Sequence, residues 1–174
     1  MRITTLGGLV LSQTATLTVI DQTVNGVVEV EFYAGSAGDG VGNRVVTFKG
    51  TDATNRPLAG WNLPLNFTNS TASFTLAHAP LGLAHLSAKT AWHLRTRLPV
   101  TFTNSVAAVS FTSASGLRAG DLDNSNTVNL GDYFILAGAW YTSNPAADMD
   151  GNGWVDLDDY FLLAQHWGEQ GDPE

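Results

Sequence analysis

The chain has 174 residues, of which 44% are hydrophobic, so it is long enough for one or two domains with a packed core. It has no cysteine, which excludes disulfides and cysteine redox chemistry. Up to Arg118 there are eight basic and five acidic side chains, whereas the rest has eleven acidic and no basic ones. This balance argues against a nucleic-acid partner, and no apolar run is long enough to predict a membrane-spanning helix.

Residues 1–116 are predicted to form strands and no long helix. Runs rich in β-branched and aromatic residues, separated by turn-forming residues, are typical of an antiparallel β-sandwich of immunoglobulin-like type. The predicted strands are 14–20, 27–33, 44–49, 63–67, 71–76, 85–89, 94–103 and 106–111. We therefore expect a mainly β protein with a β-sandwich domain in residues 1–116 and a small α-helical domain in residues 117–174.

The second half contains one pattern twice, and Asp148 in the second copy corresponds to Asp121 in the first. Oxygen-bearing side chains occupy positions 1, 3, 5, 9 and 12 of each loop, and position 7 can offer a backbone carbonyl. Ca²⁺ takes about six to eight oxygen ligands, which a loop of about 12 residues can supply. The predicted ligands of two Ca²⁺ are Asp121, Asp123, Ser125, Thr127, Asn129 and Asp132 in loop 1, and Asp148, Asp150, Asn152, Trp154, Asp156 and Asp159 in loop 2.

Details of the two loops support this interpretation. Gly151 and Gly153 suit a tight turn in loop 2, and Asn124 and Asn126, at the same positions of loop 1, tolerate positive φ. At position 8 of each loop stands a valine, and we expect the two valines to form a short apolar bridge between paired loops. Short helices are predicted over 132–140 and 159–167.

Two other interpretations of the loops are less favoured. A polar turn that only caps the next helix is possible for one copy, but both copies continue into Tyr-Phe-x-Leu-Ala. Zinc is disfavoured because there is no cysteine and only His166 lies nearby. Loop 2 is predicted to bind calcium more tightly, because Asn152 offers a better oxygen than Ser125 and Asp156 adds a charge relative to Asn129.

The motif Asp-x-Asp-x-Asn-Gly-x-Val-Asp-x-x-Asp, followed by an apolar helix and present twice, resembles a dockerin module over about a third of the chain. The resemblance implies paired calcium loop–helix units, and docking on cohesin modules of extracellular assemblies. Many cohesin-binding dockerins carry polar pairs at positions 10 and 11, where this chain has Leu130-Gly131 and Leu157-Asp158. That departure favours packing of this face on another surface, such as the neighbouring domain.

Residues 72–76, 82–89 and 92–95 resemble the small β-sandwiches of the carboxypeptidase-regulatory type, which many surface proteins place before a dockerin. Residues 82–84 read Gly-Leu-Ala where that family commonly has Gly-Thr-Tyr, so the usual aromatic residue is missing.

No catalytic motif is recognisable. His78, His85 and His93 have no partner motif, and the C-terminal carboxylates are explained by calcium, so we predict that the chain is not an enzyme. Trp61 and Trp92 are candidates for a sugar-stacking platform.

Three functions fit the sequence. The favoured one is a non-catalytic, extracellular or cell-surface structural subunit, which assembles head to tail into a fibre through its opposite charges and an N-terminal strand (12–20) added to a neighbour. The second is an anchoring domain that binds a cohesin-like partner. The third is a carbohydrate-binding sandwich with a dockerin attached. Trp140 and Trp167, at equivalent helix positions, are predicted to lie in the core.

Overall fold

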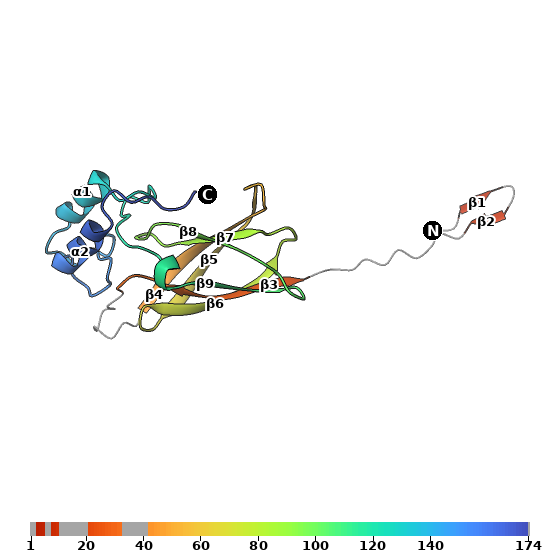
Figure 1. The fold of residues 1–174 in the computed structure, drawn as a ribbon, viewed down its shortest axis with the longest axis horizontal. Coiled ribbons are helices and arrows are strands. Elements are labelled where there is room, and N and C mark those ends of the chain that lie inside the picture. Colours follow the sequence, from red (N-terminus) through yellow and green to blue (C-terminus); the bar gives the residue numbers. More distant parts are fainter. Residues whose placement is uncertain (1–2, 6–7, 11–20, 33–41, 174) are drawn as a thin grey trace.

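The computed structural model describes residues 3–5, 8–10, 21–32 and 42–173. The fold is mainly β with a small helical part, as predicted (Figure 1). The elements are β1 (Ile3–Thr5), β2 (Gly8–Val10), β3 (Gln22–Glu29), β4 (Gly42–Thr51), β5 (Pro57–Phe67), β6 (Thr71–Ala79), β7 (His85–Lys89), β8 (Thr96–Pro99), β9 (Val106–Phe111), the 3-10 turn η1 (Ser113–Ser115), α1 (Leu130–Gly138) and α2 (Leu157–Gln165). The predicted strand 14–20 lies outside the described residues, and each helix begins two residues earlier than expected.

Two sheets form the sandwich. One contains β6, β3 and β9 in that order, and the other contains β5, β4, β7 and β8, while β1 pairs with β2 alone. All neighbouring strands are antiparallel except β3 and β9, which pair in parallel from Thr23↔Val106 to Val28↔Phe111. The expectation of a purely antiparallel sandwich is therefore corrected at this pair. A parallel pair needs a crossover, and the four strands of the other sheet supply part of it.

The core of the sandwich lies between the two sheets. Because side chains alternate along a strand, β4 buries Val46 and Phe48 and exposes Val45. The ring of Phe48 lies 4.4 Å from that of Phe74 and 6.3 Å from that of Phe111, centroid to centroid, so one aromatic cluster joins both sheets. Burying each such side chain contributes about 1.5–3 kcal/mol.

Helices α1 and α2 lie together at one end of the sandwich (Figure 1). Each begins with a capping box: Asn129 and Asp156 are the N-caps, and Asp132 and Asp159 accept the backbone N–H of the respective cap residue. A second hydrophobic cluster joins the helices, their loops and the β7–β8 connection, and it contains Leu94, Ala119, Val128, Leu136, Ala139, Ala147, Met149, Val155, Leu162 and Leu163. The helical part is thus packed on the sandwich through shared core residues.

Polar contacts reinforce this junction. Glu31, just after β3, accepts hydrogen bonds from the backbone N–H of Ala119 (3.1 Å) and the side-chain amide of Gln165 (2.7 Å), and its carboxylate lies 2.6 Å from His166 Nε2. The guanidinium of Arg44 stacks 3.9 Å from the ring centre of Trp92, whose indole N–H donates to the carbonyl of Ala146. The predicted boundary between residues 116 and 117 therefore separates two closely joined parts, and it stays a prediction.

The C-terminal segment runs back from α2 toward β8 (Figure 1). The N–H of Gly171 donates to the carbonyl of Asn126 in loop 1, and the N–H of Asp172 donates to the carbonyl of Arg95. A Cβ on Gly171 would lie 2.3 Å from Asn126 Oδ1 and 2.6 Å from the Arg95 nitrogen, so only glycine fits between them. This segment fastens loop 1 to the sandwich. No helix among the described residues is long and apolar enough to cross a membrane.

Candidate metal centres and an exposed helical face

Each loop brings three carboxylates together. Oxygens of Asp121, Asp123 and Asp132 lie within 4.8 Å of one another in loop 1, and those of Asp148, Asp150 and Asp159 do so in loop 2. These are positions 1, 3 and 12 of the predicted calcium loops. Five of the six residues are buried, and only Asp123 is exposed.

The carboxylate at position 12 organises its own loop in both copies. Asp132 accepts hydrogen bonds from the backbone N–H groups of Leu122 and Asp123 through Oδ1, and from that of Asn129 through Oδ2. Asp159 repeats this with the N–H groups of Met149, Asp150 and Asp156. The start of each helix is thereby joined to the start of its loop, which places positions 1, 3 and 12 around one centre.

The backbone of the loops agrees with the sequence interpretation. Asn124 and Asn126 have φ of 63° and 68°, and Gly151 and Gly153 have φ of 75° and 97°. The same two positions are therefore left-handed in both copies, as expected for residues that tolerate positive φ. This sharp turn confirms that the two loops have one conformation despite different residues.

The remaining predicted ligands lie in the same loops. Ser125 donates from its hydroxyl to the carbonyl of Thr127 (3.2 Å), which brings positions 5 and 7 together. At position 9, Asn129 and Asp156 accept the N–H of the residue two further on, at 2.7 and 3.0 Å. In loop 2, the side-chain oxygen of Asn152 accepts the N–H of Trp154 (2.8 Å). The side chain of Trp154 is exposed, so a ligand at this position would be its carbonyl, as predicted.

The backbones of the two valines at position 8 pair with other segments rather than with each other, and the apolar bridge between their side chains stays a prediction. Val128 exchanges backbone hydrogen bonds with Gly168 and Glu169, after α2, and Val155 exchanges them with Tyr141 and Thr142, after α1. Each loop is thus held by the segment that follows the other helix. Both valine side chains are still fully buried in the second cluster.

The electrostatics of the centres suit a cation. Burial raises the pKa of Asp150 to about 7 and also raises the pKa values of Asp159 and Asp121. Asp121 is fully buried, and its Oδ1 atom has no hydrogen-bond partner among the described residues. Crowded, buried carboxylates with an unpartnered oxygen, in a set of oxygen donors only, fit a hard divalent cation such as Ca²⁺.

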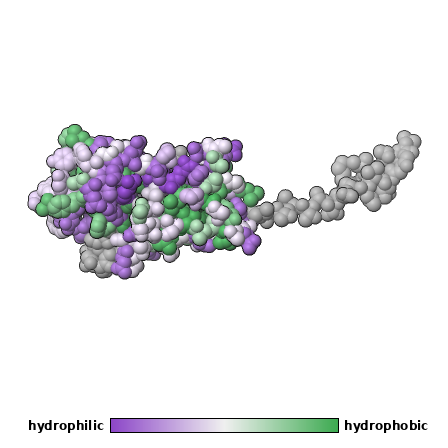
Figure 2. All heavy atoms as spheres, viewed as in Figure 1, coloured by the Kyte–Doolittle hydropathy of each residue, from purple (hydrophilic) through white to green (hydrophobic). Residues whose placement is uncertain are grey.

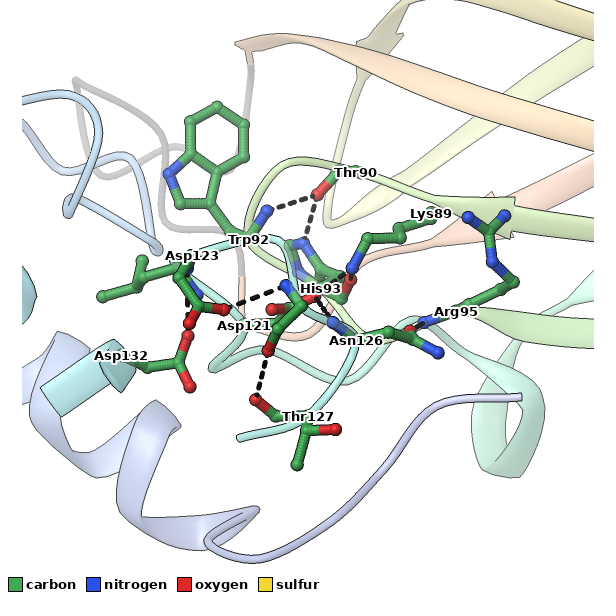
Figure 3. A network of polar contacts seen from close by, with 12 residues as sticks. Lys89, Thr90, Trp92, His93, Arg95, Asp121, Asp123, Asn126, Thr127 and Asp132 are labelled. Atoms are coloured by element: carbon green, nitrogen blue, oxygen red, sulfur yellow. Dashed lines mark hydrogen bonds and ion pairs between the residues drawn. The ribbon is translucent and has the colours of Figure 1, made fainter. Parts of the chain in front are cut away.

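Sequence reasoning missed one charged group at loop 1. Lys89, on β7, extends its buried ammonium to Asp121 Oδ2 and also donates to the carbonyl of His93 (3.1 Å). Figure 3 shows Lys89 and the backbone of Asn126 converging on Asp121, with Asp132 at the start of α1. Only the unusual presence of a lysine in a short buried strand could have signalled this contact, because 32 residues separate the partners.

The outward faces of α1 and α2 are apolar. Leu130 and Leu157 are each 54% exposed, Phe134 is 64% exposed and Phe161 is 60% exposed. Leu130 and Leu157 thus do not pack on the neighbouring domain, and the expectation that this face meets another surface stays a prediction. Figure 2 shows hydrophobic residues at the end of the molecule that the helices form. We call the exposed set Leu130, Tyr133, Phe134, Leu157, Tyr160, Phe161 and Trp167 the helical face.

The helical face contains two equivalent grooves. One, of about 390 Å³, is lined by Leu130, Tyr133, Tyr160, Leu163, Ala164 and Trp167. The other, of about 440 Å³, is lined by Leu157, Tyr160, Tyr133, Leu136, Ala137 and Trp140. Each residue of the first groove has its repeat counterpart in the second. Trp167 is 50% exposed, so its predicted place in the core is wrong, whereas Trp140 packs against the second cluster as expected.

Two further predictions concern the tryptophans proposed for sugar stacking and the opposite charges of the two halves. Trp92 packs at the junction under Arg44, and Trp61 packs against the sandwich core, so each is partly buried, and a sugar-stacking platform at either residue stays a prediction. The opposite charges of the two halves meet within the chain: Lys89 contacts Asp121, Arg118 contacts Glu169, and Arg44 donates to the carbonyls of Asp148 and Met149. These contacts leave less charge for a head-to-tail assembly.

No family model matches the sequence, and no curated protein matches it. The fold is similar to a chain in each of two crystal structures of a type II cohesin–X–dockerin complex from Acetivibrio cellulolyticus, an N-terminal and a C-terminal interface mutant. The TM-scores are 0.60 and 0.57, with 20% identity, and each match covers 86% of this chain and 97% of the other. Because 86% of 174 residues exceeds residues 1–116, the similarity reaches into residues 117–174. At this identity it shows the shared fold.

Proposed function

We propose that the chain is a non-catalytic, extracellular interaction protein, in which two calcium-loaded loops hold a helical face that docks on a cohesin-like partner. The observation that carries this proposal is the repeated unit itself: two carboxylate centres of the same geometry, each followed by a helix that exposes the same apolar residues. The fold shared with a chain of a cohesin–X–dockerin complex supports it.

In each loop, calcium would be held by the side chains at positions 1, 3, 5, 9 and 12 and the carbonyl at position 7. Bound Ca²⁺ supplies positive charge that offsets the repulsion among buried carboxylates. Hydrogen bonds within the chain position the helices and the loops. Asp132 and Asp159 fix the helix starts, and the exchanged hydrogen bonds of Val128 and Val155 fix the two halves against each other. Calcium is therefore expected to set the relative orientation of α1 and α2.

The helical face has the properties of a docking surface. Soluble proteins seldom expose a contiguous group of large apolar side chains unless it meets a partner. Here aromatic residues, which are enriched at interfaces, line two grooves that no described part of the chain covers. Leu130 and Leu157 lie at the positions through which dockerins meet cohesins. Apolar residues there favour a cohesin-like partner with an apolar contact surface rather than a polar one.

A binding experiment tests this function. The full chain is titrated against a panel of immobilised cohesin modules that includes the type II cohesin of Acetivibrio cellulolyticus, with calcium and with chelator. We expect binding that needs calcium and that Leu157→Asp and Leu130→Asp weaken. Leu81→Asp is the matched control, because Leu81 is also exposed (62%) but lies on the sandwich.

The competing functions give different results in the same experiment. If no cohesin binds and the protein sediments as a polymer in calcium, head-to-tail self-association replaces the proposal. If the chain stays monomeric and binds only polysaccharide, the carbohydrate-binding function replaces it.

A further inference from the structure

The two loops differ in what the sandwich offers them. In loop 1, the sandwich places the ammonium of Lys89 on the carboxylate of Asp121. In loop 2, Arg44 donates to the backbone carbonyls of Asp148 (3.4 Å) and Met149 (3.1 Å). The side chain of Asp148 accepts the N–H groups of Gly151 and Gly153. A cation thus contacts a ligand side chain in loop 1, and the backbone in loop 2.

Lys89 is held firmly in this place. The backbone of Lys89 pairs with Thr47 between strands β4 and β7. The side chain of Lys89 is 6% exposed, and its ammonium also donates to the carbonyl of His93. A buried ammonium is costly unless it is paired, and a buried carboxylate is costly for the same reason. Lys89 and Asp121 therefore stabilise each other when no metal is bound.

The two oxygens of Asp121 have different surroundings. Oδ2 accepts from Lys89 and from the N–H of Asn126 (3.0 Å), while Oδ1 is buried and has no partner among the described residues. Oδ1 is thus the oxygen free to bind a metal, and Lys89 can stay on Oδ2 when the metal arrives. A positive charge would then remain a few ångströms from a divalent cation, where Coulomb repulsion is strong.

Both effects change calcium affinity in the same direction. Lys89 stabilises the calcium-free loop by neutralising Asp121, and it destabilises the calcium-bound loop by repulsion. We propose that Lys89 is a built-in cation of loop 1, which keeps that loop docked on the sandwich without calcium and makes it the weaker of the two calcium sites. This inference rests on the proposed calcium binding. It implies that the loops fill in sequence as calcium rises, loop 2 first.

The test follows each loop separately in the full chain. Amide signals of Gly131 in loop 1 and Gly153 in loop 2 are monitored by nuclear magnetic resonance while calcium is added to calcium-depleted protein. Lys89→Met should raise the affinity at loop 1 by at least about tenfold, with loop 2 changed less than about threefold. Lys89→Arg keeps the positive charge, so the calcium affinity of loop 1 should stay low. Lys49→Met, which removes a positive charge from the neighbouring strand β4, is the control.

The outcomes separate this inference from the proposed function. Unchanged or lower affinity at loop 1 in Lys89→Met, or an equal rise in Lys89→Arg, overturns the role of Lys89 while calcium binding stands. If neither glycine signal responds to calcium in the unsubstituted protein, the proposed calcium sites fail and this inference fails with them. If Lys89→Met folds only with calcium, its affinity is measured from the loaded protein against a chelator, with the same expectation.

Discussion

Loop 1 and loop 2 have nearly the same backbone and different electrostatics. Their two left-handed positions, their position-12 hydrogen bonds and their exchanged backbone pairs correspond one to one. Loop 2 contains five aspartates, four of them at predicted ligand positions, whereas loop 1 has three and receives Lys89 and the C-terminal segment. The repeat thus provides the geometry of each centre, and the surroundings set its charge. A duplicated motif need not give two equal sites.

Removal of calcium is the largest perturbation of this comparison. A ligand at 100 times its Kd stabilises the folded state by about 2.7 kcal/mol, and each loop would lose such a contribution. We expect chelator to abolish much of the helical circular dichroism while the sandwich, which has its own aromatic core, stays folded. Once both loops are empty, hydrogen exchange should rise more in loop 2 and α2 than in loop 1, because Lys89 still supports loop 1. Unchanged helical signal in excess chelator would contradict the role of calcium.

Position 3 allows the loops to be compared without disturbing Lys89. Asp150→Asn and Asp123→Asn each remove one ligand charge, and a loss of about 100-fold in affinity at one site corresponds to about 2.7 kcal/mol. Because loop 2 is proposed to be the tighter site, Asp150→Asn should lower the calcium-induced rise in Tm more than Asp123→Asn. Differential scanning calorimetry with and without calcium measures the calcium-induced rise in Tm of both variants. Equal losses of this rise would contradict the ranking of loop 2 above loop 1 in calcium affinity.

The pH dependence of the calcium-free protein follows from the raised pKa of Asp150, which is about 7 in the fold against an ordinary value of 3.8. A folded state that prefers the neutral carboxyl is most stable below the unfolded pKa and loses that stability as pH rises toward 7. Thermal unfolding in calcium-depleted buffer should therefore show a higher Tm at pH 5 than at pH 8. Asp150→Asn should flatten this slope, and a Tm that rises with pH in the parent protein would refute the assignment.

Gly171→Ala tests the fastening of loop 1 by the C-terminal segment. The added Cβ would meet Asn126 Oδ1 and the backbone of Arg95, and such overpacking costs about 1–3 kcal/mol. Gly138→Ala is the control. Its added Cβ would meet nothing within 4 Å, and the higher helix propensity of alanine should make helix α1 slightly more stable. Chemical denaturation measures both changes. A Gly171→Ala protein as stable as the parent would show that the C-terminal segment adds nothing to the stability of the fold.

Local patterns predicted much of this molecule. Alternation marked the strands near Phe48 and Phe74, and the repeated oxygen positions marked both carboxylate centres, because each depends on residues close in the chain. The glycine and asparagine positions even predicted where φ becomes positive.

Contacts between distant segments could not be predicted. The parallel pairing of β3 with β9, and the contact of Lys89 with Asp121, depend on how the sheets and the helical part pack. For the same reason, the sequence left open which surface Leu130 and Leu157 contact. An apolar residue at a helix start is compatible with a core or with a partner surface, and only the packed structure distinguishes them.

Native mass spectrometry of the full chain in calcium tests the central claim most directly. We expect two calcium ions per folded chain, reached through a populated one-calcium species in which loop 2 is filled. Asp150→Asn and Asp123→Asn should each lower the occupancy by one ion at limiting calcium. A chain that stays free of calcium at millimolar concentration, or that binds one ion unaffected by either substitution, would contradict it.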